Sequence, residues 1–497
     1  MRETDFDKKS QDFLVWFKNL PGATFHDHIS IVDLRARNAG RGIVTTADIE
    51  PDTVLFTIPR QHIIYPANSE LARKLPAVFA GVGGSGPTPD VDDDDGRAQD
   101  SWTSLILVMI HEHLRGSASP WRPYLDVLPA RFETPMFWSA AELAELQASP
   151  VVASVGRAEG DAMIRSRILP VIRENEALFF GAGGAAMGDE ELVELAHRMG
   201  STIMAYAFDL ERDDDAMDED DAEGDGWVED RDGRTVMGMV PMADILNADA
   251  EFNAHINHSE EALVAISLRK IPAGEEILNY YGPLPNGQLC RRYGYTTSKH
   301  SRYDVAEVAW EPILDGVLSR VKMTRDEWRK LEAHPKAGEA GSDDDGDNSE
   351  GDGDTYVLER DCEDPDELGQ LQGSPRFAQL PDELTERLKA VLKAAKKARP
   401  EAVPDKKARD DLMLGAVRDA IDAKLREYGT SLEEDAATLA GLGGGASARV
   451  RMALEVRIGE KRLLREARAW LDRKLGGDGQ GERMELDAPS AKRQRRA

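Results

Sequence analysis

The hydrophobic and polar pattern of the chain changes near residue 300. Before that point, β-branched and aromatic runs with turn residues between them predict strands at 43–46, 54–59, 235–240, 262–268 and 275–281. Amphipathic or apolar periodicity predicts helices at 10–20, 102–114, 139–147, 160–180 and 189–208. The turn at 50–52 predicts that the first two strands form a hairpin or meander.

One sequence plan occurs twice on either side of the predicted helices. ADIEPDTVLFTIP near residue 50 and RKIPAGEEILNYY near residue 275 each contain an isoleucine, a proline turn with Asp or Gly, and a β-run. A β-module that is divided by a long helical insertion has this arrangement. We therefore expect an α+β fold with the insertion at about 98–208, preceded by an N-terminal helix within 1–22.

Beyond residue 300 the pattern is helical. Apolar residues recur every three or four positions, as on one face of a helix, at Leu414, Val417, Ile421, Leu425 and Tyr428. A last long helix contains Val450, Leu454 and Ile458 and should end near Leu475. We expect a first domain over 23–300, a separate all-α domain over 301–475 with an acidic linker at 338–354, and a disordered, basic-ended tail at 476–497.

The net charge of −30 is concentrated in short acidic segments: five acids at 90–95, fourteen at 209–232 and seven at 343–354. Runs this poor in apolar residues favour disordered loops such as 209–232, or alternatively attract a basic partner at long range. An acidic chain is poorly suited to direct binding of nucleic acid. No apolar run approaches the ~20 residues of a membrane helix, so neither partner is expected.

The two cysteines, Cys290 and Cys362, cannot form a disulfide framework or a Cys-rich zinc site. The N-terminal sequence lacks the basic and apolar parts of a secretory signal. We therefore expect a reduced, intracellular protein. His111 and His113 have the wrong spacing for an H-E-x-x-H site and no cysteines accompany the other histidines, so no metal is expected.

Three polar segments contain candidate functional residues. In NAGRGI (38–43) two glycines flank Arg41, which suits close approach of a ligand or simply a tight turn. In PMADILNADAEFNA (241–254), Asp244 and Asn247 could hold an amino-acid-like ligand or form an Asx turn. NYYGPLPNGQLCRRYGY (279–295) holds four of the ten tyrosines, more than aromatic core packing readily explains.

In this order the three segments resemble the SET domain of protein lysine methyltransferases. The helical C-terminal part is similar to the substrate-binding domain of the rubisco large-subunit methyltransferase branch, in YGTSLEEDAATLA (428–440) and RVRMALEVRIGEKRLL (449–464). Most of that branch has Ser-Arg where this chain has Ala205-Tyr206, and Asn-His where it has Asn247-Ala248. The ribosomal-type lysine methyltransferases of the branch share both departures.

The resemblance implies roles for individual residues. The residues that it assigns to binding of S-adenosyl-L-methionine are Ala39, Gly40, Arg41, Tyr206, Asn247, Ala248 and Tyr293. It makes Tyr281 the catalytic tyrosine and lets Tyr293 also line the lysine channel. Trp102 is either a wall of the substrate site or an aromatic residue that caps a buried helix.

We therefore expect a protein-lysine N-methyltransferase, monomeric, that acts on a basic protein of the large ribosomal subunit. A transcription factor or histone is the alternative substrate, and a non-catalytic SET-fold binding protein is the alternative class. The terminal KRQRR is typical of a nuclear localisation signal or of a solvated tail. We expect the protein in the nucleus, and in the cytoplasm as a second compartment.

Overall fold

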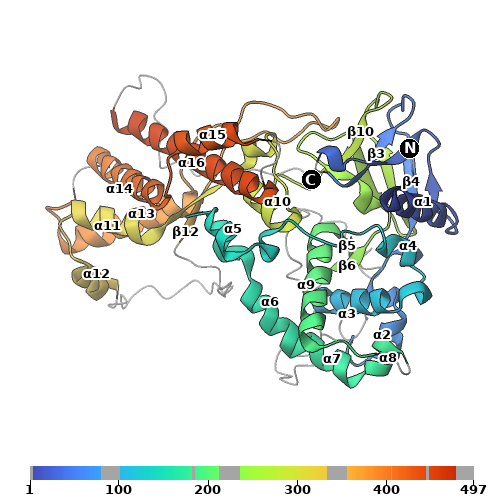
Figure 1. The fold of residues 1–497 in the computed structure, drawn as a ribbon. Coiled ribbons are helices and arrows are strands. Elements are labelled where there is room, and N and C mark those ends of the chain that lie inside the picture. The colour runs from blue at the N-terminus through green and yellow to red at the C-terminus, as the bar shows by residue number, and fades with distance from the viewer. Residues whose placement is uncertain are drawn as a thin grey trace.

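The computed structural model describes residues 4–37, 39–79, 101–181, 185–211, 235–332, 355–403, 406–443 and 447–476. The acidic segments at 90–95 and 343–354, the linker at 338–354, positions 212–232 and the tail after residue 476 lie outside these ranges. The β-strands lie with α1 (Asp5–Lys18) at one end, the insertion helices lie below them, and the C-terminal helices form the other end (Figure 1).

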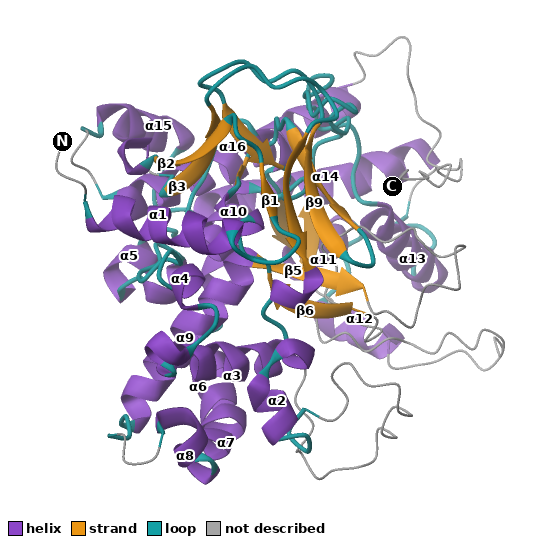
Figure 2. Ribbon diagram, turned by 90° about the vertical axis from the view of Figure 1, so that its right-hand side faces the viewer, coloured by secondary structure: helices purple, strands orange, loops and turns teal. Residues whose placement is uncertain are grey.

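Two four-stranded sheets form the β-region, in the orders β1-β4-β9-β8 and β2-β3-β10-β7 (Figure 2). The strands of the first sheet are β1 (Thr24–Phe25), β4 (Val54–Pro59), β9 (Ala262–Ser267) and β8 (Ala254–His258). Those of the second are β2 (Ile29–Asp33), β3 (Arg41–Thr45), β10 (Glu276–Asn279) and β7 (Asn247–Ala248). Each sheet combines strands from both sides of the insertion, as the repeated sequence plan predicts.

The predicted hairpin of the runs at 43–46 and 54–59 is wrong. These runs are β3 and β4, which belong to different sheets. The turn between them, where Asp52 has a φ of 58°, carries the chain from one sheet to the other. Each strand then pairs with a partner from beyond the insertion, β3 with β10 and β4 with β9, because those partners complete a buried core that a local hairpin would leave exposed.

The two copies of the sequence plan contact each other directly. Ile49 and Ile271, the isoleucines that open the plan, each donate a backbone hydrogen bond to the other, both of 2.9 Å. Both side chains are almost fully buried. The repeated sequence plan therefore lies where the two halves of the β-module meet.

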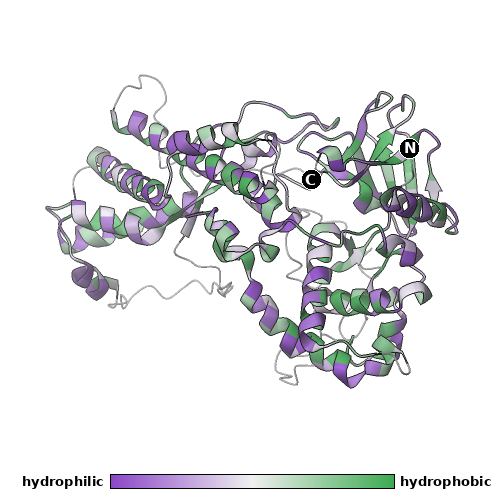
Figure 3. Ribbon diagram, viewed as in Figure 1, coloured by the Kyte–Doolittle hydropathy of each residue, from purple (hydrophilic) through white to green (hydrophobic). Residues whose placement is uncertain are grey.

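Helices make up most of the insertion. They are α2 (Glu70–Lys74), α3 (Ser101–Leu114), α4 (Arg122–Leu125), α5 (Ala140–Ala144), α6 (Arg157–Met163), α7 (Leu169–Glu174), α8 (Glu176–Phe180) and α9 (Asp189–Tyr206). A π-helical turn, Ile164–Ile168, joins α6 to α7. The expected helix at 160–180 is thus three shorter ones. Apolar residues concentrate on the strands and on the inward sides of these helices (Figure 3).

One part of the predicted acidic loop is a strand. β5 (Ala207–Glu211) pairs with β6 (Thr235–Met239) in an antiparallel hairpin. The loop prediction is therefore wrong for 209–211. In this segment apolar residues alternate with acids, which is the period of a strand, and Leu210 is buried in the core.

The C-terminal region is helical, and with the sheets before it this confirms the expected α+β class. α10 (Asn286–Tyr293) precedes this region, at the end of the expected first domain. The helices of the C-terminal region are α11 (Trp310–Arg320), α12 (Arg325–Glu332), α13 (Asp382–Ala398), α14 (Lys406–Glu427), α15 (Leu432–Gly441) and α16 (Ala448–Gly476). Val417 and Ile421, on the predicted face of α14, are fully buried. A two-stranded sheet of β11 (Ala306–Ala309) and β12 (Thr355–Leu358), which the sequence analysis did not predict, joins this core. Among the described helices, none is both long and apolar enough to cross a membrane.

Candidate functional site

Asn247, in the segment 241–254, contacts the glycine-flanked segment 38–43. Its Nδ2 donates hydrogen bonds to the backbone oxygen of Arg41, at 3.0 Å, and to Oε1 of Glu276, at 2.7 Å. Gly42 makes this approach possible, because a Cβ at that position would lie 2.9 Å from Asn247 Nδ2. The amide of Asn247 is thereby held against the backbone of the glycine-flanked segment.

The turn that precedes Arg41 presents backbone rather than side chains. Gly40 has a φ of 65°, which favours glycine, and its carbonyl accepts a 2.8 Å hydrogen bond from the backbone of Leu34. Nothing lies within 4 Å of the position where a Gly40 Cβ would stand. Ala39 is part of the same turn, through a hydrogen bond to the Leu34 carbonyl. Asn38 lies outside the described residues.

The guanidinium of Arg41 is tied to the N-terminal helix. It donates to Ser10 Oγ at 2.8 Å and to the Val127 carbonyl at 2.8 Å, and it lies 3.8 Å from the centroid of the Phe6 ring. Burial lowers the pKa of Arg41 more than the nearby acids raise it. The side chain therefore fixes the segment to α1, while the backbone of Arg41 faces Asn247.

The second part of the site is a cluster of phenols. Tyr281 donates a 3.0 Å hydrogen bond to the carbonyl of Leu246, the residue before Asn247. Its ring stacks on that of Tyr293 with centroids 5.0 Å apart, and Tyr293 lies 6.1 Å from Tyr295. We call Tyr281, Tyr293 and Tyr295 the tyrosine cluster. It is connected to the Asn247–Arg41 contact through one peptide unit.

The tyrosine cluster is neutral. Burial raises the pKa of each of its three phenols well above the ordinary value, and for Tyr281 and Tyr295 the neighbouring phenols add to the rise. The hydroxyl of Tyr295 is buried without a hydrogen-bond partner among the described residues. Because such a group costs free energy unless it is paired, it is suited to a polar ligand.

Asp244 lies close to the tyrosine cluster. Tyr124 donates a 2.6 Å hydrogen bond to its Oδ2, while its buried Oδ1 has no partner among the described residues. Burial raises the pKa of Asp244 to about 7, although the Tyr124 hydrogen bond acts in the opposite direction. The backbone two residues earlier is strained, since Met242 has a φ of 83°.

Tyr206 and Trp102 occupy different surroundings. Tyr206 ends α9, and burial and the nearby Asp244 raise the pKa of its phenol while Arg41 lowers it. Trp102 is on α3, where its Cζ2 would lie 3.6 Å from a Cβ on Gly200 of α9. That is packing within the insertion core. The substrate role of Trp102 stays a prediction.

Glu276 and Tyr124 belong to the site but were not singled out from the sequence. Glu276 is one of two consecutive glutamates in a strand, and Tyr124 is 120 positions away from the aspartate that it contacts. The sequence around either residue gives no indication that it belongs to the site. Tyr295, by contrast, lies in the tyrosine-rich segment 279–295. The number of tyrosines in that segment could have identified it as a site residue.

Two sequence families match this chain. The SET domain family matches residues 40–282, which include both parts of the site. The Rubisco LSMT substrate-binding family matches residues 365–464. The SET match therefore spans just under half of the chain. The SET match begins in the turn before Arg41 and ends directly after Tyr281, so its limits coincide with the segments that the structure brings together.

Curated relatives and solved structures agree with this assignment. The chain is 31% identical over 317 residues to ribosomal lysine N-methyltransferase 4 of Saccharomyces cerevisiae, covering 63% of this chain and 60% of that protein. It is 28% identical to the human N-lysine methyltransferase SETD6, covering 57% and 54%. The chain thus spans between half and two thirds of the length of these relatives.

The fold is similar to that of Rubisco LSMT. A crystal structure of its SET domain bound to lysine and AdoHcy matches with a TM-score of 0.59 at 19% identity, over 95% of this chain and 92% of that one. A structure of Rubisco LSMT bound to AdoMet matches with a TM-score of 0.57 over 94% and 92%. The expected SET fold with a helical C-terminal domain is confirmed.

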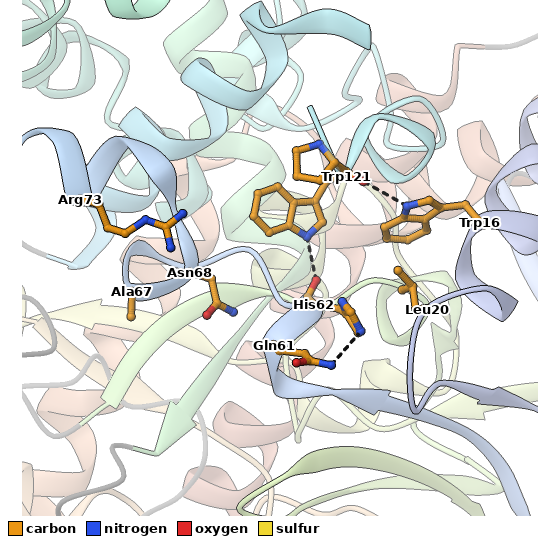
Figure 4. Close-up of a pocket in the computed structure, with 9 residues that line it drawn as sticks. Trp16, Leu20, Gln61, His62, Ala67, Asn68, Arg73 and Trp121 are labelled. Atoms are coloured by element: carbon orange, nitrogen blue, oxygen red, sulfur yellow. Dashed lines mark hydrogen bonds between the residues drawn. The ribbon is translucent and has the colours of Figure 1, made fainter. Parts of the chain in front are cut away.

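Two hollows in the described structure are lined by residues other than the predicted ones. One, of about 330 Å³, lies between α1 and the start of α4. There the indole nitrogens of Trp16 and Trp121 donate to the backbone oxygens of Pro120 and His62, which fixes both rings (Figure 4). The other is a cleft of about 820 Å³ along α9.

Proposed function

We propose that this chain is an S-adenosylmethionine-dependent protein-lysine N-methyltransferase. The observation that carries the proposal is a pair of hydrogen bonds on neighbouring residues. Asn247 donates to the Arg41 carbonyl, and Tyr281 donates to the carbonyl of Leu246, the residue before Asn247. This pair connects, within the residues of the SET match, the open backbone at Gly40 and Arg41 with a neutral phenol cluster. Relatives named as lysine methyltransferases in yeast and in mammals support the same activity.

The residues present fit S-adenosylmethionine. The open backbone at Gly40 and the amide of Asn247 suit an amino-acid portion, and the unpartnered hydroxyl of Tyr295 suits a polar group of the ligand. When bound, the cofactor supplies an electrophilic methyl group on a sulfonium cation. Ala39, Gly40, Arg41, Tyr206, Asn247, Ala248 and Tyr293 are the residues that we assign to holding it.

The tyrosine cluster prepares the substrate amine. A lysine ammonium has no lone pair, and its ordinary pKa is about 10.4. Among buried neutral phenols the charged form is disfavoured, so the pKa of the lysine falls and the amine can lose its proton. The cluster therefore favours the nucleophilic form of the substrate.

Tyr281 orients that amine. Its O–H donates to the Leu246 carbonyl, and a phenol oxygen can also accept, here from the lysine N–H. An amine held in this way, and aligned with the methyl carbon, reacts as part of one complex. Tyr293, stacked on Tyr281, restricts the ring and lines the channel.

The substrate that we favour is a basic protein of the large ribosomal subunit. The name of the yeast relative, which is a ribosomal lysine methyltransferase, supports this choice. The net charge of −30 suits association with a basic protein, because complementary charge speeds encounter.

The test is methyl transfer from labelled S-adenosylmethionine to purified ribosomal subunits. We expect label in one small basic protein, and a loss of about 100-fold or more in Tyr281→Phe, since this variant removes the group that orients the amine. Tyr280→Phe is the matched control, because Tyr280 stacks on Phe252 at 4.7 Å and its ring is retained. Label that persists in Tyr281→Phe would remove the tyrosine from the mechanism.

A further inference from the structure

The cleft along α9 lies beside the proposed active site. Its walls come from the end of α3, from α9, from the segment 130–137 and from Arg449 of α16. The segment 130–137 borders the tyrosine cluster, because a Cβ on Gly294, next to Tyr293, would be 3.0 Å from the backbone carbon of Glu133. A chain whose lysine entered the tyrosine cluster would thus have its flanking residues near this cleft.

The four glutamates that line the cleft already have partners. Glu133 pairs with Arg449 at 2.7 Å, Glu190 with Arg165 at 2.8 Å, and Glu194 with Arg157 at 2.5 Å. The fourth, Glu191, accepts a 3.0 Å hydrogen bond from the Gly188 backbone and so caps α9. Three of the four carboxylates are thus paired with arginines, whereas Glu191 keeps its charge and lies in the first turn of α9, where the helix dipole stabilises it.

Arg198 is the more buried of the two lining cations that are not in an ion pair among the described residues. It is half-buried in the cleft, and its Nη2 lies 2.8 Å from Nε2 of His113. Burial, with no acid opposing it, lowers the pKa of Arg198, and burial and Arg198 together lower that of His113. Neither Arg198 nor the exposed Arg131 has an ion pair within the described ranges. His113 is thus a neutral acceptor for one N–H of Arg198, which leaves the guanidinium, as part of the cleft lining, with further donors for a ligand.

The floor of the cleft is apolar. Phe132 and Phe137 stack with ring centroids 5.8 Å apart and an interplanar angle of 19°. Leu114 and Leu195 complete this surface from α3 and α9, and Leu195 and Phe132 are both largely buried. A cavity with an apolar floor and one oriented cation can hold a side chain of each kind.

We propose that this cleft binds a segment of the protein substrate in which an aspartate or glutamate stands next to a bulky apolar residue. The carboxylate pairs with Arg198, and the apolar side chain lies on Phe132 and Phe137. Charge complementarity selects this occupant, because a half-buried cation without a counter-charge is costly and Arg gains most from a bidentate carboxylate. The inference rests on the proposed function, since it places the acidic residue near the target lysine.

The first test is the steady-state kinetics of methyl transfer to the ribosomal protein that becomes labelled. In Arg198→Gln we expect KM for the protein substrate to rise about tenfold with kcat and cofactor affinity little changed, as for loss of a hydrogen bond to a charged group. Arg198→Lys keeps the positive charge but not the paired N–H donors of the guanidinium, so its KM should lie between those of Arg198→Gln and the wild type. Arg122→Gln, which breaks an ion pair outside the cleft, is the control. An unchanged KM in Arg198→Gln would overturn the proposal.

A second measurement separates the cleft from the methyl transfer. The full chain, without cofactor, is titrated with acetyl-Leu-Glu-Phe-amide and with acetyl-Leu-Gln-Phe-amide and followed by saturation-transfer NMR. We expect saturable binding of the Glu probe that weakens about tenfold in Arg198→Gln, and weaker binding of the Gln probe to both proteins. Equal binding of the two probes would overturn the cleft assignment even if methyl transfer succeeds. Selective binding without methyl transfer would sustain it while the proposed function fails.

Discussion

Two buried polar clusters of this protein differ in how completely their groups are paired. In the first, around the tyrosine cluster, the Tyr295 hydroxyl and Asp244 Oδ1 have no partner among the described residues. In the second, which we call the C-terminal network, Asp435 is bound by Arg457 at 2.7 Å, by Lys461 at 2.5 Å and by Thr430 Oγ1 at 2.7 Å. These unpaired atoms are buried, as is the C-terminal network, although the three tyrosines are only half-buried as whole residues. Burial of the polar atoms alone therefore does not distinguish the two clusters.

The C-terminal network connects the helical region to the insertion. Glu460 of α16 accepts hydrogen bonds from Ser149 Oγ at 2.6 Å and from the Tyr428 hydroxyl at 2.7 Å. Gln147 Nε2 donates to Thr430 Oγ1 at 3.1 Å. A network whose groups satisfy one another holds domains together, whereas a cluster with unpaired polar atoms is prepared for a ligand. This difference leads to opposite expectations for mutations in the two places.

The largest effect is expected in the C-terminal network. Asp435→Ala leaves Arg457 and Lys461 buried without their carboxylate, which should cost about 3–5 kcal/mol of unfolding free energy. Urea unfolding measures the loss. Asp472→Ala, at an exposed pair 3.6 Å from Arg418, should cost less than about 1 kcal/mol. Equal losses in the two variants would contradict the structural role of the network.

Gly42→Ala should have an intermediate effect, and on the site rather than on the domains. The new Cβ would lie 2.5 Å from Leu34 Cδ1 and 2.9 Å from Asn247 Nδ2, so the Asn247–Arg41 contact must open. We expect a loss of about 1–3 kcal/mol in stability and weaker cofactor binding. Gly441→Ala, where nothing lies within 4 Å, is the control. An unaltered cofactor affinity in Gly42→Ala would show that the contact is not needed.

The smallest effect concerns pH. Asp244 has a pKa of about 7 in the folded chain against about 3.9 when unfolded, so the folded state binds the extra proton between these values. Stability from this group therefore falls as pH rises from about 4 to about 7, and the loss is complete above that range. Asp304 and Glu460, whose pKa values burial also raises to about 7, act in the same direction.

Asp244→Asn removes the contribution of Asp244 to the pH dependence of stability and leaves those of Asp304 and Glu460. Melting temperatures at pH 5, 6, 7 and 8 should decline less steeply in the variant, by a few degrees over the range. Parallel curves for the variant and the wild type would mean that Asp244 does not titrate in this window.

The sequence predicted elements and residue types better than it predicted pairing. The run at 54–59 is β4 over the same residues, and the tyrosine-rich segment contains the whole tyrosine cluster. The hairpin prediction failed because local turn chemistry cannot reveal that β4 pairs with β9, which lies beyond the insertion. Tyr124 was missed for the same reason, since only tertiary packing brings it to Asp244.

The central claim is that Arg41, Asn247 and the tyrosine cluster form a cofactor site. Calorimetric titration of the purified chain with S-adenosylmethionine tests it most directly, with Asn247→Ala beside the wild type and exposed Asn257→Ala as the control. The account predicts one bound molecule per chain, an affinity about tenfold weaker in Asn247→Ala, and no change in Asn257→Ala. No binding to the wild-type chain would contradict the account and favour a non-catalytic SET fold.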